Sequence, residues 1–462
     1  MKLLNNGVYL FDKSFPIHTW YPILDGKELP NDELIFALEN LDTTEIKERA
    51  LYFHIPFCEK NICSFCTFPR KLINNPEEID NYVECLIKEI ELKSQYKSIG
   101  KVPVKSIFFG GGTPSVLTAN HIQKLGAKIH ENFDLSELKE WSFENNIQSI
   151  TEDKLIALKS IGVTHVRAGV QSLNKKYRKY FDLVPTVSEV KEKVRLLKKH
   201  FENVCIDIIY GINGQTIDEF MLDVHEACRL DTKLIDFYPL TQPKGNMKLK
   251  NLFIEDGLIP KNEMQLLGFM MILREMMKNY GYAPHNGHGF VKSNDLDSIY
   301  TKEYVFEYHK ACLGYGNGDV IGFGSGASSR TISYGFDNYS NVTEYQKALK
   351  KDKLPTHVFS IKNNLFYSKS ISSHLPYFGY ADKNKIDWGK IDNATKVNFE
   401  ELLKAGVIIE EDEQYKLSQL GWYWNHVLSY YLSPEADRLI LESSLEKVDR
   451  TLYEFSFGEC HE

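Results

Sequence analysis

Between residues 50 and 280 the sequence alternates short apolar segments with amphipathic segments, and this alternation limits the fold more than any other feature. The amphipathic segments carry apolar residues at helical spacing, and some begin with a Thr or Asn that can cap a helix. Strands that alternate with helices in this way form βα units around a parallel sheet. We count six units, with strands predicted at 50–55, 104–112, 138–144, 163–172, 204–211 and 234–240.

Residues suited to ligand binding stand at the ends of five of these strands. In a parallel α/β fold, ligands bind at the carboxyl ends of the strands. Three cysteines follow the first strand, and the sequence GGGTPS follows the second. Glu144 ends the third strand, GVQS ends the fourth, and Asp207 lies in the fifth. Because these strand ends meet at one edge of the sheet, the sequence predicts a single site there.

The three cysteines, Cys58, Cys63 and Cys66, lie within nine residues. A structural zinc site needs four ligands, commonly in two pairs, and a second pair is missing from the sequence. Cys63 and Cys66 alone have the spacing of a redox pair. An iron–sulfur cluster held by three cysteines keeps one iron open for another ligand. The cluster best explains a triplet on a loop at the ligand-binding end of a βα domain. The other five cysteines are scattered singly and are expected to be buried, reduced thiols.

The remaining candidate residues have both a structural and a functional explanation. The glycines of GGGTPS can form a tight turn, or they can let backbone N–H groups approach a charged group. A P-loop is disfavoured because the Lys of that motif is missing. Asp207 lies inside an apolar strand, so it needs a partner when buried. Tyr52 and His54 alternate on the first strand and share a face. His285 and His288 have a spacing that metal ligands can use, but carboxylates are missing from their neighbourhood in the sequence.

Five motifs occur in a fixed order: YFHIPFC with two further cysteines, FFGGGTPS, GVQSLN, DIIYGINGQT and GFGSGASS. Together they resemble the oxygen-independent coproporphyrinogen III oxidase-like branch of the radical S-adenosylmethionine (SAM) enzymes, over roughly residues 45–345. Two features depart from the family pattern. The family spacing is C-x3-C-x2-C, whereas here four residues, EKNI, separate Cys58 from Cys63. Arg167 stands two residues later on its strand than the family's arginine, where it can meet a ligand carboxylate or form an ion pair within the barrel.

The resemblance implies that Cys58, Cys63 and Cys66 hold a [4Fe–4S] cluster whose open iron binds the amino and carboxylate groups of SAM. It places Tyr52 and His54 near the cluster and the sulfonium, as the catalytic residues. One or two SAM molecules are expected, with the second SAM or the substrate beside GFGSGASS unless that segment is only a turn. The cofactor-binding residues that the resemblance implies are Gly111, Gly112, Thr113, Glu144, Arg167, Gln171, Asp207, Gly324, Gly326 and Ala327.

The predicted fold class is α/β, with a partial (β/α)6 radical SAM barrel at residues 50–285. An N-terminal arm at 1–49 precedes the barrel, and a barrel extension that covers the substrate is expected at 286–355. The last segment, 356–462, is expected to form a C-terminal accessory domain. Its sequence indicates a helix, a glycine turn, a strand hairpin and another helix, which is typical of a helical, winged-helix-like domain.

Composition and charge narrow the range of partners. The chain has 55 basic and 63 acidic residues, a net charge of −8, which disfavours nucleic acid as a ligand. The sequence contains no apolar run long enough for a spanning helix, so no membrane association is expected. The first residues do not have the pattern of a signal peptide, and a cytoplasmic protein is expected.

The sequence thus predicts a radical SAM enzyme that acts on a tetrapyrrole-like or other conjugated or heteroaromatic small molecule. It needs an external electron, so a flavodoxin- or ferredoxin-like donor is implied. Oxidative decarboxylation, ring opening of haem, and methyl transfer or cyclopropanation with a second SAM remain open as reactions. The alternative from another class is a haem-binding chaperone that keeps the cluster without turnover.

Overall fold

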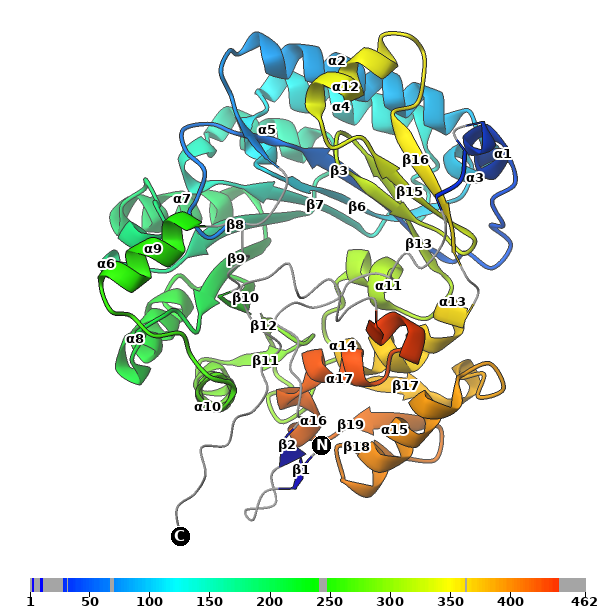
Figure 1. The fold of residues 1–462 in the computed structure, drawn as a ribbon. Helices are drawn as coiled ribbons and strands as arrows, with labels where there is room; N and C mark the ends of the chain where they lie inside the picture. The colour runs from blue at the N-terminus through cyan, green and yellow to red at the C-terminus, as the bar shows by residue number, and fades with distance from the viewer. Residues whose placement is uncertain are drawn as a thin grey trace.

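One curved sheet of twelve strands organises the described part of the chain (Figure 1). The structure is a computed structural model of the full chain, and it describes residues 2–3, 9–10, 28–30, 32–66, 70–240, 247–361 and 364–439. About half of the predicted N-terminal arm and residues 440–462, which include Cys460, lie outside the described residues. The strand order in the sheet is β11-β12-β10-β9-β8-β7-β6-β3-β13-β14-β15-β16.

The six strands of the predicted βα units lie side by side and run parallel. They therefore confirm the predicted α/β class and place six carboxyl ends at one edge of the sheet. Their inward and outward residues are both largely buried, as expected for a parallel sheet that is covered on both faces. The six strands are β3 (Glu48–Ile55), β6 (Val104–Gly111), β7 (Glu140–Asn145), β8 (His165–Gln171), β9 (Asn203–Tyr210) and β10 (Leu234–Pro239).

Long helices cover the outer face of this sheet (Figure 1). Thr118, Thr186 and Thr216 each begin one of them with a capping box, which satisfies backbone N–H groups of the first turn. Each helix packs on the strands with a buried apolar face, to which Leu125 in α4 and Val194 in α7 belong. The covering helices are α2 (Glu77–Ser94), α4 (Ala119–Asn132), α5 (Glu152–Ser160), α7 (Val187–His200), α8 (Ile217–Cys228) and α10 (Glu263–Asn279).

Short strands extend the sheet at both edges. At one edge β12 (Gly289–Lys292) pairs antiparallel with β10, and β11 (Tyr282–Pro284) pairs with β12. At the other edge β13 (Gly318–Phe323) runs parallel to β3. Three antiparallel strands continue from β13: β14 (Ser328–Arg330), β15 (Tyr334–Asn338) and β16 (Thr356–Ser360). These strands are too short and too rich in polar residues and glycine to give a clear period in the sequence.

The shorter helices lie between these elements, and six of them are α1 (Glu33–Glu39), α3 (Lys97–Gly100), α6 (Lys175–Tyr180), α9 (Met247–Glu255), α11 (Glu307–Leu313) and α12 (Val342–Leu349). None of the helices in the described ranges is both long and apolar enough to cross a membrane.

The C-terminal region lies across the open side of the curved sheet, next to α11 (Figure 1). Tyr300 donates a hydrogen bond to the carbonyl of Pro376 at 2.9 Å, and Asn425 donates one to the carbonyl of Gly287 at 3.1 Å. The C-terminal region contains the predicted helix, strand hairpin and second helix. Its elements are α13 (Asn364–Lys369), a π-helical turn (Ser370–His374), α14 (Leu375–Phe378), β17 (Tyr380–Asp382), α15 (Asn393–Lys404), β18 (Ile408–Glu410), β19 (Gln414–Leu417), α16 (Gln419–Tyr423) and α17 (Asn425–Tyr431).

His374 is buried among aromatic rings in this region. Its ring stacks on Tyr315 at 3.8 Å between centroids and lies 4.7 Å from the ring of Phe378. Neither ring nitrogen has a hydrogen-bond partner within the described structure. Burial, together with the positive charges of Lys310 and Lys369, lowers the pKa of His374 to about 3. The imidazole is therefore neutral in the folded protein at physiological pH.

We predict that His374 makes the folded state less stable in acid. The unfolded chain protonates this group near its ordinary pKa of about 6.5, whereas the folded chain does not. The free energy of unfolding should fall as the pH decreases from about 6.5 toward 4, by an amount on the order of a few kcal/mol from this group. Urea unfolding of the wild type and of His374→Phe at pH 7.5 and 5 checks this. The Phe variant should lose less stability between the two pH values, and equal losses would contradict the prediction.

Candidate functional site

One pocket opens at the carboxyl ends of β3, β6, β7, β8 and β9. It brings together three thiols, the end of the glycine run and polar side chains from three further strands. Most of the residues that the sequence singled out for ligand binding therefore share one lining. Those that line the pocket are Cys58, Cys63, Cys66, Gly111, Gly112, Thr113, Glu144, Arg167, Gln171 and Asp207.

The cysteine loop begins at Cys58 in the short strand β4 (Phe57–Cys58), which pairs with β5 (Lys71–Leu72). Two side chains anchor the loop to the end of α6 and to the segment that follows it. Asn61 donates a hydrogen bond to the carbonyl of Asp182 at 2.5 Å, and Ser64 donates one to the carbonyl of Tyr180 at 2.5 Å. Asn61 is one of the four residues that separate Cys58 from Cys63. The longer spacing is thus accommodated by a loop with defined contacts.

The three thiols suit an iron–sulfur cluster better than a structural zinc ion. They line one pocket, and the four other cysteines of the described ranges do not line it. Burial, followed by the neighbouring thiols, raises the pKa of Cys63 to about 12, and burial also raises the pKa of Cys58. Thiolates this close together need a cationic centre to neutralise them. Three such donors would hold a [4Fe–4S] cluster with one open iron.

The glycine run has a structural role that the sequence did not reveal. Gly112 donates its N–H to the carbonyl of Ile55 at 2.9 Å, and a Cβ at Gly112 would lie 2.8 Å from the carbonyl oxygen of Phe57. Gly111 has a φ of +116°, which side chains other than glycine rarely allow. The hydroxyl of Thr113 lies 3.8 Å from the sulfur of Cys58. The run therefore lets the end of β6 pass directly against the segment that leads into the cysteine loop.

In the pocket, Glu144 has a raised pKa and Gln171 has a strained backbone conformation. Burial, together with the nearby negative charge of Asp207, raises the pKa of Glu144 to about 7, and Arg167 opposes this shift. Gln171 has a φ of +67° where the β8–β9 register shifts. A non-glycine residue in this region of backbone space is strained, and such strain concentrates at ligand sites.

Arg167 is the partner that the buried Asp207 needs. Its guanidinium lies 3.2 Å from an oxygen of Asp207 and in closer contact with Asp236. Burial raises the pKa of Asp207 to about 6 despite Arg167. Burial also disfavours the Asp236 carboxylate, but Arg167 and two histidines outweigh it and lower the pKa of Asp236 to about 2. Arg167 thus forms an ion pair inside the barrel, one of the two roles that the sequence allowed.

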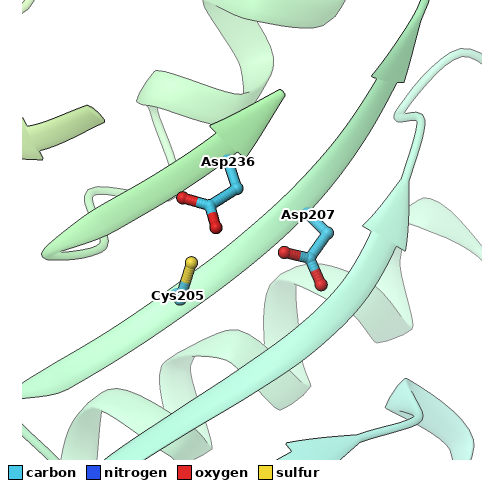
Figure 2. A group of neighbouring side chains, drawn as sticks. All are labelled: Cys205, Asp207 and Asp236. Atoms are coloured by element: carbon cyan, nitrogen blue, oxygen red, sulfur yellow. The ribbon is translucent and has the colours of Figure 1, made fainter. Parts of the chain in front are cut away.

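Asp236 was missed in the sequence, although a signal for it exists. It lies inside the apolar strand LIDFYP and is the direct register partner of Asp207 in the neighbouring strand. Cys205, Asp207 and Asp236 face one another in Figure 2. Their possible ligand atoms lie within 4.8 Å of one another, a spacing that a metal ion could use. Because Arg167 already supplies the positive charge here, we interpret the group as an ion-pair network.

A histidine also joins this network. His288 Nε2 lies 3.7 Å from an oxygen of Asp236, so the fold places a carboxylate beside the pair His285 and His288 that the sequence does not show.

A second residue that the sequence did not indicate is Arg178. It donates hydrogen bonds to the carbonyls of Val170 and Ser172 at 3.0 and 2.8 Å, and it lines the pocket. It lies in the basic segment KKYRKY, where the sequence does not distinguish the one buried cation from the exposed ones.

Tyr52 and His54 lie immediately behind the pocket. Their side chains are hydrogen-bonded to each other at 2.9 Å, as expected for residues on one strand face. A Cβ at Gly111 would lie 2.9 Å from the ring of His54. Neither residue is part of the pocket lining. Their catalytic role stays a prediction.

Gly324, Gly326 and Ala327 are not part of the pocket lining either. They form the turn between β13 and β14, and the glycines have φ angles of +99° and +77°. The N–H of Gly324 donates to the carboxylate of Glu89 at 2.7 Å. Such a turn needs glycines for its own geometry, so a contact with SAM or substrate stays a prediction.

Comparison with known proteins gives a consistent picture. A family model described as "Radical SAM superfamily" matches residues 52–227. The chain is 29% identical over 359 residues to "Heme chaperone HemW" of Lactococcus lactis subsp. lactis, which covers 77% of this chain and 87% of that protein. It is 24% identical over 351 residues to "Oxygen-independent coproporphyrinogen III oxidase" of Synechocystis sp., which covers 75% of this chain and 74% of that protein.

Among solved structures, the fold resembles that of coproporphyrinogen III oxidase (HemN) from Escherichia coli. The TM-score is 0.76, with 18% sequence identity, and the match covers 90% of this chain and 96% of that chain. At this identity the likeness establishes the fold.

We predict that Arg167→Leu destabilises the protein strongly. The change leaves the buried carboxylates of Asp207 and Asp236 without their cation, at a cost of about 3–5 kcal/mol. Urea unfolding of the iron-free protein at pH 7.5 measures the loss. The double variant Arg167→Leu/Asp236→Asn removes one of the two negative charges, so it should recover part of that stability. Equal stability of Arg167→Leu and wild type would show that the guanidinium does not balance these carboxylates.

Proposed function

We propose that this chain, a member of the radical SAM superfamily, binds SAM at a [4Fe–4S] cluster and cleaves it reductively to start radical chemistry on a tetrapyrrole-like or other conjugated substrate. The observation that carries this proposal is the shared pocket. Cys58, Cys63 and Cys66 line it together with Glu144, Gln171 and Asp207, which come from three further strand ends. A bound cluster supplies one electron and an open iron for the amino acid part of SAM.

The side chains around the thiols suit the polar groups of SAM. Glu144 offers a buried acceptor that a positively charged amino group would ionise. Asp207 lies on β9 and would accept hydrogen bonds from the ribose hydroxyls with its carboxylate. Gln171 lies on β8, the strand between those of Glu144 and Asp207, and it supplies an amide to the pocket. The register shift after Gly169 accompanies its strained backbone conformation. These residues would orient SAM and exclude water from the reacting bond.

The proposed substrate class rests on the relatives. The printed names of the relatives refer to heme and to coproporphyrinogen. Behind the pocket, the rings of Phe108 and Tyr308 stack at 4.7 Å between centroids, and Tyr52 stacks on Phe108 at 6.2 Å. These rings are buried against one another and do not line the pocket, so they close the inside of the barrel behind the site and do not themselves select a substrate.

A haem chaperone without turnover is the second candidate. The observation in its favour is the 29% identity with a protein named heme chaperone, over 77% of this chain. Such a protein would bind haem and keep the cluster, but it would not consume SAM. The two functions therefore differ in a product that can be measured.

We predict that the cysteine triplet holds iron. Anaerobic reconstitution should load about four irons and four sulfides per chain. Cys58→Ala, Cys63→Ala and Cys66→Ala should each lower the iron content and the brown absorbance. Cys85→Ala is the matched control, because Cys85 is a buried thiol on α2 that does not line the pocket. Stoichiometric zinc without a brown chromophore would overturn the cluster assignment.

We predict that the reconstituted protein consumes SAM. With SAM and dithionite under anaerobic conditions, 5′-deoxyadenosine should accumulate, as measured by chromatography. Asp207→Asn keeps the shape of the side chain and removes its charge, so SAM affinity should fall by roughly tenfold or more. Stable haem binding with no consumption of SAM would favour the chaperone instead.

A further inference from the structure

The cysteine loop and the end of α6 form one continuous surface beside the pocket. Phe65 of the loop packs edge to face on Phe181 with ring centroids 5.0 Å apart, and Ser64 bonds to Tyr180 as described above. Asn61 adds a second hydrogen bond between the two segments, to the carbonyl of Asp182. A partner that touches this surface therefore lies next to the thiols that we assign to the cluster.

This surface is basic in a chain that is acidic overall. Residues 58–66 and 174–185 contain four exposed lysines, the buried Arg178 and two acidic residues, whereas the chain has 55 basic and 63 acidic residues. Lys60, Lys175 and Lys179 are exposed. Lys60 is the neighbour of Asn61, and Lys179 is the neighbour of Tyr180, so these two lysines flank the contact between loop and helix. Lys175 and Lys179 lie one helical turn apart on the same side of α6.

Three nearby carboxylates each have a partner of their own. Asp182 forms an ion pair with Lys248 at 2.6 Å, and the carboxylate of Glu59 accepts a hydrogen bond from Ser149 at 3.0 Å. Glu219, at the start of α8, forms an ion pair with Lys176 at 3.0 Å. Glu189 lies near Lys60, and its carboxylate accepts hydrogen bonds from the N–H and the hydroxyl of Thr186. Within the described residues these acids do not form ion pairs with Lys60, Lys175 or Lys179.

Apolar side chains are also exposed close to the loop. Val184 is 53% exposed on the rim of the pocket, and Leu72 is 38% exposed on β5, the partner strand of Cys58. A protein interface combines an apolar centre with a charged rim, and this surface offers both.

We propose that Lys60, Lys175 and Lys179 form the docking surface for a small acidic electron-carrier protein that reduces the cluster. The inference rests on the proposed function, which needs one electron per SAM cleaved. The carrier would lose one electron and the cluster would gain it, with no bond formed or broken at the surface. A basic surface on an acidic chain steers an acidic carrier to the thiols and away from the rest of the molecule.

The test compares two reductants on the reconstituted protein. Reduced flavodoxin, an acidic one-electron carrier, and dithionite each support 5′-deoxyadenosine formation in separate assays at low ionic strength. The triple variant Lys60→Glu/Lys175→Glu/Lys179→Glu should lose roughly tenfold or more of the flavodoxin-dependent rate and keep the dithionite-dependent rate. Lys404→Glu, an exposed lysine at the end of α15, is the matched control and should change neither rate. Added salt should slow the wild-type flavodoxin reaction more than that of the triple variant.

Direct binding separates this inference from the proposed function. Flavodoxin should bind the reconstituted wild type and bind the triple variant at least tenfold more weakly, whether or not SAM is cleaved. If dithionite yields no 5′-deoxyadenosine in the wild type, the proposed function fails while the binding result still decides the docking surface. Equal flavodoxin binding and equal flavodoxin-dependent rates in wild type and triple variant would overturn the inference. An equal loss with both reductants and unchanged flavodoxin binding would overturn it too.

Discussion

The parallel pairing of β3, β6, β7, β8 and β9 is the constraint on which the site depends. Because these strands lie in chain order and run in one direction, residues separated by about 150 positions meet at one edge. Their backbone hydrogen bonds are satisfied within the sheet, which leaves the side chains at the strand ends available for a ligand. The glycine run adds a close backbone contact, since Gly112 packs directly on the backbone before Cys58. A larger residue at Gly112 would therefore displace the cysteine loop from the other strand ends.

Charge inside the barrel is the second constraint. Two carboxylates, Asp207 and Asp236, face each other in register, and a single guanidinium balances them. Burial makes each ionised group costly, and the network persists because Arg167 contacts both acids. The two acids share this cation unequally. Asp236 has a lowered pKa, whereas Asp207 has a raised one and faces the pocket, so Asp207 retains the greater capacity to respond to a ligand.

The sequence was most informative where a pattern repeats. The six βα units and the pocket residues at their ends follow from periodicity and from parallel topology, and the fold class is confirmed. Asp236 shows a limit of this reasoning, because only the register of β9 and β10 places it opposite Asp207. Gly324 shows another, because the same glycines suit a ligand contact and a turn, and only the backbone angles and the bond to Glu89 reveal the turn. The strands of three to six residues between β11 and β16 depend on pairing with neighbours rather than on their own sequence.

The four-residue spacing between Cys58 and Cys63 links the site to its surroundings. A longer loop between two ligands is harder to hold in one conformation, because more backbone freedom must be lost. Here Asn61 of this segment donates a hydrogen bond to the carbonyl of Asp182 after α6, so a neighbouring element fixes the loop. The same contact brings the basic helix α6 beside the thiols. The segment between the first two cysteines therefore both carries the additional residue and contacts the surface that lies next to the proposed cluster.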